Sequence, residues 1–296
     1  MKIVPVIILI LFLVTCNNVK RNNSIYNEST GNNGSPVDDQ GCKIPGNREI
    51  EKQKKNQNPF DLTEAELIEM ISGLPSKIKT RIMEKSGEFL KLIDRALTLP
   101  EKTLVLVDKD HPLPADYIPE DLVNLNTYPL VLSKKNLILR RTILPDLLEM
   151  VVDAEKEGIT LVLSSCYRSY KTQERIYNWN VETYGKAQAD RESAQPGKSQ
   201  HQLGVTIDFG TITDEYASTP AGKWLIKNAW KYGFSLSYPE EMEWLTGYKH
   251  ECWHYRYISR IGTKIEKEFF EGIQQYFLIF MNENREKLFY KKSIAN

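Results

Sequence analysis

The stretch Ser199-Gln-His-Gln-Leu-Gly-Val-Thr-Ile-Asp208 carries the strongest functional signal in the sequence. His201 and Asp208 are both residue types that bind zinc, and Gly204 between them lets the backbone turn or approach closely. Three β-branched residues precede or lie next to Asp208, so the pattern predicts that this carboxylate lies on or at the end of a strand. A catalytic zinc site uses three protein ligands and keeps one position open. The stretch therefore supplies two ligands and requires a third.

The third ligand is predicted downstream, in Glu251-Cys-Trp-His254. His254 would complete the metal set, and Glu251 would stay off the metal as general base. A bound zinc ion lowers the pKa of its water towards neutrality, and a nearby carboxylate can then take the proton. These residues indicate a zinc hydrolase.

A second interpretation is that His250-Glu-Cys-Trp-His254 is the His-Glu-x-x-His motif of zinc proteases. That motif requires a helix, so that both histidines share one face. Here the flanking residues alternate with period two and include aromatics, which favours a strand with a bend between Glu251 and His254. The helical interpretation also leaves His201 and Asp208 without a role. In the favoured interpretation His250 lies near the site but neither binds the metal nor takes part in catalysis.

The rest of the chain predicts an α+β fold, a small and mostly antiparallel sheet flanked by helices. Arg168 follows one predicted strand, where a cation could stabilise charge developing on a substrate, although it could equally be a surface arginine. We expect helices at residues 61–71, 76–97, 144–156, 221–231 and 261–290 and through Gln173. We expect strands at 103–107, 159–164, 232–238 and within 248–258, and loops at 185–198 and 239–246.

Length and charge limit the function classes. The chain has 296 residues, with Lys+Arg and Asp+Glu equal at 39 each, so net charge gives no reason to expect nucleic acid. Residues 61–100 carry no catalytic constellation and are interpreted as a helical packing segment or spacer. Residues 101–296 are the predicted catalytic domain, and a monomer is expected.

The N-terminus predicts export. Residues 1–16 contain an apolar run too short to cross a bilayer, which needs ~20 residues, but long enough for a signal peptide. Leu13-Val-Thr-Cys16 is similar to a bacterial lipobox, so Cys16 is the predicted lipidation site; an uncleaved anchor is the alternative. Residues 17–60 are polar and are interpreted as a flexible tether. The predicted location is the cell envelope, with the protein held at the membrane by its lipid.

Four cysteines are present, and two of them, Cys166 and Cys252, lie beside proposed active-site residues. A disulfide between them is one hypothesis, because the protein is predicted to be exported. Two buried free thiols that behave as small apolar residues are the favoured alternative.

A set of motifs spread over residues 103–260 carries a family resemblance. They are Pro112-Leu-Pro-Ala-Asp-Tyr-Ile-Pro-Glu-Asp-Leu-Val123, Tyr167-Arg-Ser-Tyr-x-x-Gln173, Ser199-x-His201-x-x-Gly204-x-x-x-Asp208, Tyr232-Gly-Phe, Tyr238-Pro239, Thr246-Gly247, Glu251-x-Trp253-His254 and His254-Tyr-Arg-Tyr257. Together they resemble the VanY-type D-alanyl-D-alanine carboxypeptidases, which are related to D,D-dipeptidases and to the hedgehog fold. Cys252, Ser237 and Thr206 stand where the family more often has Pro, Arg and Ala.

The resemblance implies a zinc ion held by His201, Asp208 and His254, with Glu251 as base and Arg168 steadying the oxyanion. It also implies that Ser199 and Gln173 help hold the terminal carboxylate of the substrate. The implied substrate is a peptidoglycan stem peptide ending in D-Ala-D-Ala.

Three alternatives stay open at this point. Two are enzymes on the same scaffold, a D,D-dipeptidase and a peptidoglycan endopeptidase. The third is a non-catalytic, zinc-stabilised module that binds the cell wall, against which Glu251 and Arg168 argue because binding alone needs neither.

Overall fold

The computed structural model describes residues 58–295 of the chain. The helices of this part are α2 (Glu64–Met70), α3 (Ser76–Glu84), α4 (Ser86–Ala96), α5 (Leu144–Lys156), α6 (Tyr170–Tyr184), α7 (Lys186–Glu192), α8 (Pro220–Asn228), α9 (Glu243–Thr246), α10 (Ser259–Phe269) and α11 (Gln274–Ala295). The strands are β1 (Leu122–Asn124), β2 (Val131–Leu132), β3 (Ile138–Arg140), β4 (Val162–Ser165), β5 (Thr206–Phe209), β6 (Phe234–Leu236) and β7 (His254–Tyr257). None of these helices is both long enough and apolar enough to span a bilayer.

A five-stranded sheet carries the stretch that contains Asp208. The strand order is β2-β4-β5-β7-β6, in which β2 pairs parallel with β4 and the other pairings are antiparallel. Strands β1 and β3 form a separate antiparallel pair. The predicted α+β fold with a small, mostly antiparallel sheet flanked by helices is confirmed.

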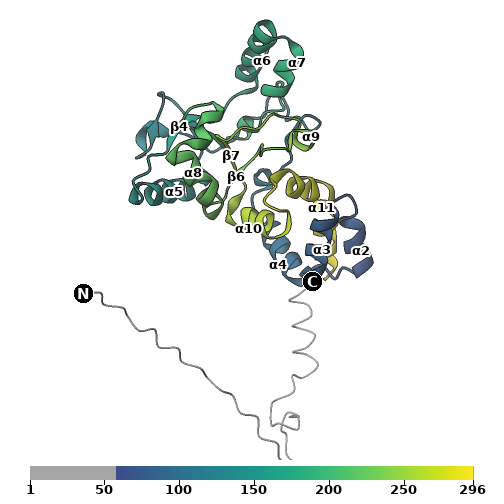
Figure 1. Cartoon of the computed structure of the whole chain (residues 1–296). Coiled ribbons are helices and arrows are strands. Elements are labelled where there is room, and N and C mark those ends of the chain that lie inside the picture. The colour runs from purple at the N-terminus through teal and green to yellow at the C-terminus, as the bar shows by residue number, and fades with distance from the viewer. Residues whose placement is uncertain (1–57, 296) are drawn as a thin grey trace, which may run out of the picture. The chain divides into compact units, whose positions relative to one another are not determined.

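The two faces of the sheet differ, because successive side chains of a strand point to opposite faces. Ile207 and Phe209 of β5 and Tyr255 of β7 enter a first hydrophobic core, together with buried residues of α5 and α8. Figure 1 shows these two helices beside the sheet. Asp208 and His254, which are register partners on β5 and β7, therefore project from the opposite face.

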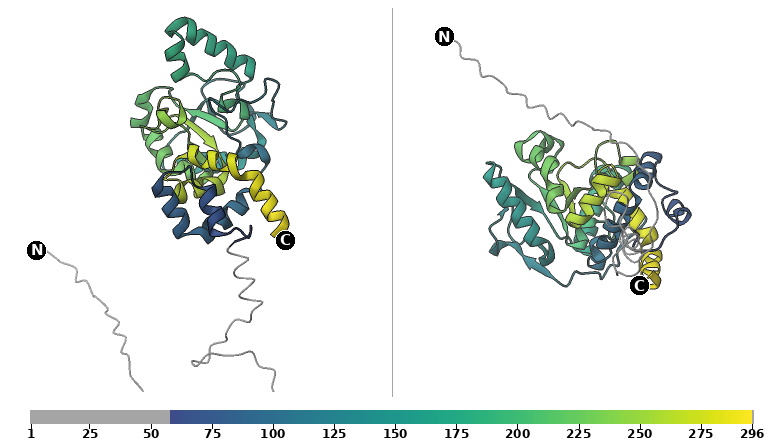
Figure 2. Two further views of the ribbon diagram at one scale, coloured as in Figure 1. Left: turned by 90° about the vertical axis from the view of Figure 1, so that its right-hand side faces the viewer. Right: turned by 90° about the horizontal axis from the view of Figure 1, so that it is seen from below.

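A second hydrophobic core joins the two ends of the described chain. It contains buried residues from 60–106, mostly on α2, α3 and α4, and from 258–288, mostly on α10 and α11. The ring of Phe89 on α4 contacts those of Phe269 and Phe280 edge-on, with centroids 5.1 and 5.4 Å apart. Figures 1 and 2 show these five helices at one end and α6 and α7 at the other. The predicted N-terminal helical segment thus shares its core with the last helices.

The predicted strand at residues 103–107 is wrong, because these residues pair with no neighbouring strand. The run is apolar because Leu104 and Leu106 enter the second core. The carbonyl oxygen of Val105 accepts a hydrogen bond from the buried side chain of Arg256 at 2.6 Å. Burial and a side-chain donor therefore replace the sheet that the sequence suggested.

Two predicted helices are each divided in the structure. The predicted helix at 76–97 is α3 and α4, and the break at Lys85 precedes Ser86 and Gly87, which are weak helix formers. The predicted terminal helix at 261–290 is α10 and α11, separated by Glu271 and Gly272, which both have positive φ.

Two predicted loops contain short helices. Residues 185–198 include α7, which packs on α6 and buries Ala189. The segment is polar, and for that reason its sequence predicts a loop. Residues 239–246 include the single turn α9. An ion pair joins the two, since Arg191 of α7 donates two hydrogen bonds to Glu243 of α9 at 2.5 and 2.7 Å.

The environment of Glu266 on α10 is expected to make the stability of the protein depend on pH. It is buried and accepts a hydrogen bond from Ser235 Oγ of β6 at 2.7 Å, and burial raises its pKa from 4.5 to about 8. A raised folded-state pKa stabilises the protein below the unfolded pKa, and this stabilisation is lost as the pH rises through the folded pKa.

The free energy of unfolding of wild type should therefore fall relative to Glu266→Gln between about pH 5 and pH 9, by ~1.4 kcal/mol for each unit of pKa shift at most. Urea unfolding at both ends of that range measures the difference, with Glu283→Gln on the exposed side of α11 as control. Parallel stability curves for wild type and Glu266→Gln would contradict the expectation.

Candidate active site

A tight turn places His201. The residue lies in a 3-10 turn, η4 (Gln200–Leu203), which Ser199 caps: its Oγ accepts from the His201 N–H at 3.3 Å. Gly204 ends the turn with φ of 70°, and a Cβ there would lie 3.0 Å from the side chains of Arg140 and Leu122. Glycine meets both conditions without strain, so the chain can turn directly from His201 into β5.

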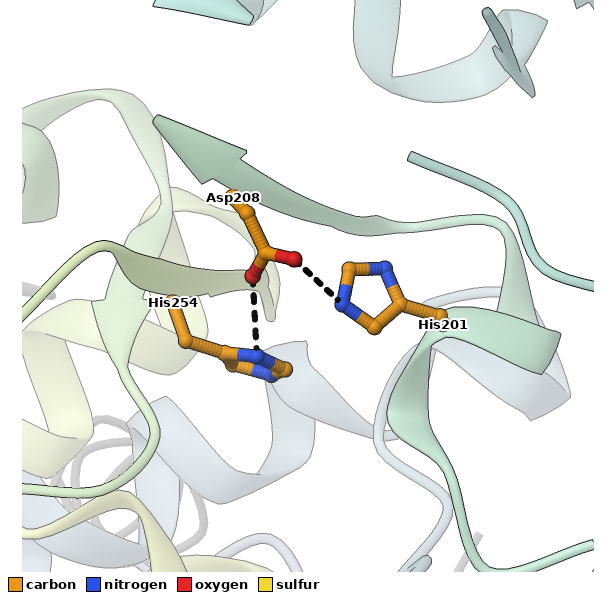
Figure 3. A group of neighbouring side chains, drawn as sticks. All are labelled: His201, Asp208 and His254. Carbon is orange, nitrogen blue, oxygen red and sulfur yellow. Dashed lines mark ion pairs between the residues drawn. The ribbon is translucent and has the colours of Figure 1, made fainter. Parts of the chain in front are cut away.

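The structure brings together the three side chains that the sequence assigned to the metal. Asp208 Oδ2 lies 3.1 Å from His201 Nε2, and Asp208 Oδ1 lies 3.1 Å from His254 Nδ1 (Figure 3). All three residues are buried, and one ligand atom from each lies within 4.8 Å of the other two. The β5–β7 register provides two of them and the η4 turn the third.

Each histidine has one nitrogen aimed at Asp208 and the other engaged elsewhere. His201 Nδ1 lies 2.6 Å from the carbonyl oxygen of Cys166, to which it can only donate. His254 Nε2 lies 3.3 Å from Gln200 Oε1. A neutral imidazole carries one proton, so in the tautomers that these contacts favour, Nε2 of His201 and Nδ1 of His254 would offer lone pairs to a cation at the shared centre.

The pKa values of these groups reflect a buried negative charge at the centre. Burial lowers the pKa of His201 to about 4. Burial acts in the same sense on His254, but hydrogen bonds to Asp208 and Glu251 outweigh it and raise the pKa of His254 to about 9. Burial alone would raise the pKa of Asp208, yet the two histidines hold it well below its usual range. The hydrogen bonds to the two carboxylates therefore favour positive charge on His254, whereas burial disfavours it on His201.

Glu251 lies beside this group and lines a pocket. Its Oε2 is 3.2 Å from His254 Nδ1, and its side chain keeps 18% of its exposure. The backbone turns between the two residues, since the His254 N–H donates to the Glu251 carbonyl at 3.2 Å before β7 begins. This turn is the bend that the sequence required to place both side chains on one side.

The alternative based on a His-Glu-x-x-His helix is wrong. Residues 250–253 contain no helix, and His254 begins a strand. His250 Nδ1 instead lies 2.8 Å from the carbonyl oxygen of Tyr238, and His250 is not part of the three-residue group.

Arg168 lines the same pocket. Its Nη2 lies 3.7 Å from Asp208 Oδ2 and donates to Ser165 Oγ at 3.0 Å, while its backbone N–H donates to the His201 carbonyl at 3.2 Å. Its Nη1 donates to Gln173 Oε1 at 2.8 Å. The guanidinium is thus fixed at the pocket wall, where a carbonyl oxygen that gains negative charge could be stabilised.

The two residues assigned to the substrate carboxylate have different surroundings. Ser199 is buried and lines the pocket. Gln173 is also buried, but both ends of its amide are engaged: Oε1 accepts from Arg168, and Nε2 donates to the Ala194 carbonyl at 2.6 Å. Gln173 therefore holds Arg168 in place, and a contact of either residue with a substrate stays a prediction.

The pocket beside these residues is small, about 180 Å³. Pockets for drug-sized ligands are usually ~300–1,000 Å³, so this one suits the end of a chain rather than a whole peptide. Sequence reasoning missed several lining residues, among them Tyr248, whose buried hydroxyl has no hydrogen-bond partner within residues 58–295. No periodicity or motif in the sequence distinguishes such a tyrosine from a core residue.

Cys166 and Cys252 are both buried free thiols. Burial raises the pKa of each thiol above its ordinary value. The disulfide hypothesis is therefore wrong, and the favoured alternative of two small apolar side chains is confirmed.

The donor set fits a zinc ion. Two imidazole nitrogens and one carboxylate are a known ligand combination for catalytic zinc. In addition, the buried Asp208 Oδ1 and His254 Nδ1 face each other at 3.1 Å, and both are atoms that can bind a cation. A metal ion at this centre would satisfy both buried polar atoms, so their arrangement supports the assignment.

Comparisons with known proteins agree with this geometry. The model of the family "VanY: D-alanyl-D-alanine carboxypeptidase" matches residues 136–260. YodJ of Bacillus subtilis (strain 168) is 31% identical over 249 residues, which cover 80% of this chain and 90% of YodJ. Among solved structures, the LD-carboxypeptidase LdcB has a TM-score of 0.53 at 34% identity, with coverage of 58% of this chain and 86% of LdcB. The D,D-pentapeptidase VanY from a VanB-type resistance cassette, in complex with Zn(II), has a TM-score of 0.51 at 29% identity and covers 60% of this chain and 99% of its own.

Proposed function

This chain belongs to the VanY family of D-alanyl-D-alanine carboxypeptidases, and from that membership we propose that it is a zinc enzyme that removes the terminal D-Ala of peptidoglycan stem peptides. The observation that carries the proposal is the buried group of His201, Asp208 and His254 beside Glu251 and Arg168 at one pocket. The Zn(II) in the related VanY structure supports the choice of metal.

His201 Nε2, Asp208 and His254 Nδ1 would hold the zinc ion. When bound, zinc supplies a Lewis acid that makes water acidic near neutral pH and polarises a carbonyl. Asp208 contributes the negative charge, and the contacts on the far nitrogens of the two histidines hold both rings in orientation.

Glu251 is the proposed general base. Its Oε2 takes the proton of the attacking water, the water oxygen bonds to the carbonyl carbon, and the C–N bond to the last residue breaks. The same carboxyl then gives the proton to the leaving amine, so protons and electrons balance. Arg168 faces the pocket and stabilises the charge that develops on the carbonyl oxygen.

A second candidate activity is that of an L,D-carboxypeptidase, which removes D-Ala from a residue of L configuration. The observation that favours it is the likeness to LdcB, described as an LD-carboxypeptidase, at 34% identity. Both activities use the same water attack, and they differ only in how the pocket receives the residue before the cleaved bond.

Two muropeptides distinguish these activities when the zinc-loaded chain is incubated with each and the products are weighed by mass spectrometry. Loss of one D-Ala from a pentapeptide ending in D-Ala-D-Ala establishes the D,D-carboxypeptidase, whereas loss of D-Ala only from the tetrapeptide establishes the L,D activity. Chelation of the metal should stop the reaction, and added zinc should restore it. Cleavage of neither peptide would refute the proposal.

We also propose that the protein is exported and held at the membrane by a lipid on Cys16. This residue lies outside the described part of the chain, so the support is the sequence of residues 1–16. Labelling with a radioactive fatty acid should mark wild type and spare Cys16→Ser; equal labelling of both would refute the lipidation. The monomeric state stays a prediction.

A further inference from the structure

The nitrogen of the His254 ring that points away from Asp208 faces a side-chain hydrogen-bond acceptor. His254 Nδ1 faces Asp208 and Glu251, and His254 Nε2 lies 3.3 Å from Gln200 Oε1. An imidazole that offers Nδ1 to a metal carries its proton on Nε2, and a hydrogen-bond acceptor there fixes both the tautomer and the ring orientation. Gln200 is 2% and His254 4% exposed, so no solvent competes for this contact.

The amide of Gln200 is itself held in one orientation. Ser237 Oγ donates to Gln200 Oε1 at 2.7 Å, and Gln200 Nε2 donates to Gln274 Oε1 at 3.4 Å. Thr206 Oγ1 of β5 donates to the backbone carbonyl of Gln200 at 3.1 Å. These contacts direct the carbonyl end of the Gln200 side chain at His254 and its NH₂ end away.

This arrangement differs from that behind His201. The acceptor for His201 Nδ1 is the backbone carbonyl of Cys166, which every residue type at that position would provide. The acceptor for His254 is a side chain, and one of its partners, Gln274, is the first residue of α11. The orientation of His254 therefore depends on residue identity and on the docking of a helix of the second core.

We propose that Gln200 is a positioning residue for the metal, which fixes His254 with Nδ1 free and so sets the zinc affinity. The proposal rests on the proposed function, because it takes zinc as the ion that the three side chains hold. Because the Gln200 amide is neutral, Asp208 and Glu251 are the negatively charged groups that face His254. Loss of a hydrogen bond that orients a metal-binding side chain typically lowers metal affinity ~10–100-fold.

The test compares Gln200→Met with Gln202→Met in the full chain. Both glutamines are buried in the same η4 turn, but the Gln202 side chain hydrogen-bonds to the carbonyls of Pro114 and Tyr117 rather than to a proposed ligand. We expect Gln200→Met to lower zinc affinity ~10–100-fold, measured by competition with a chromogenic chelator. Gln202→Met should bind zinc within about threefold of wild type, although both variants lose hydrogen bonds and should have a lower Tm.

Equal zinc affinities for wild type and Gln200→Met would overturn the proposal, as would an equal loss in both variants. If Gln200→Met does not fold, Gln200→Asn serves instead, because it keeps the amide but is one methylene too short to reach His254. Release of D-Ala is measured on the same samples. Tight zinc binding by wild type without D-Ala release would refute the proposed function alone, whereas the comparison of zinc affinities would still decide the role of Gln200.

Discussion

Replacing Glu251 by alanine is expected to lower kcat for D-Ala release by ~10²–10⁴-fold while zinc affinity stays within about threefold of wild type. The carboxylate lies at the pocket, 3.2 Å from His254 Nδ1, but it is not among the three side chains that converge on the metal position. Its removal therefore takes away a proton acceptor and no ligand. Steady-state kinetics at saturating zinc and chelator competition measure the two quantities separately.

The matched control for this variant is Glu240→Ala. The Glu240 side chain is 82% exposed and lies outside the pocket, so kcat should be unchanged. Loss of zinc together with turnover in Glu251→Ala would mean that the carboxylate is a ligand. Unchanged turnover would place the base elsewhere.

Asp208→Asn is expected to lower zinc affinity by more than ~100-fold, since the loss of a ligand should exceed the ~10–100-fold effect of an outer contact. Asp208 is the only one of the three converging side chains that is an acid, and the asparagine keeps its shape without its charge. A ligand that binds only the folded state stabilises it by mass action, so wild type should gain Tm on adding zinc and the variant should gain almost none. Thermal unfolding with and without zinc measures both.

Asp116→Asn is the control for this comparison, because Asp116 is exposed and far along the chain from the candidate ligands. It should show the zinc-dependent gain in Tm of the wild type. The same gain in Asp208→Asn would show that Asp208 does not bind the metal.

The elements that sequence patterns predicted well have local signals. Helix α5 has Pro145 in its first turn and Gly158 just after its end, and it spans Leu144–Lys156 as predicted. Helix α2 begins after Thr63, whose side chain forms a capping box with Glu66. The predicted strand at 103–107 was wrong although nothing in its local sequence argues against a strand. An apolar run indicates that residues are buried, but not which partners their backbone groups bond to.

The residues of the candidate site also divide into those with a local sequence signal and those without one. Histidine is scarce in this chain, with four copies in all, so two of them at suggestive spacings from acidic residues stand out. The amide of Gln200 has no such signal, because its role comes from partners 37 and 74 residues away along the chain. Tyr248 is similar, since its place in the pocket depends on the packing of several elements.

The docking of the terminal helices limits how far the enzyme can be trimmed. The family match ends at residue 260 and begins at 136, yet Arg256 donates to the carbonyls of Thr103 and Val105, and Gln200 bonds to Gln274. A fragment cut to the matched region would remove both carbonyl acceptors of the Arg256 side chain and most of the second core around Ile258. The smallest fragment that is expected to keep the site intact therefore includes both flanking segments.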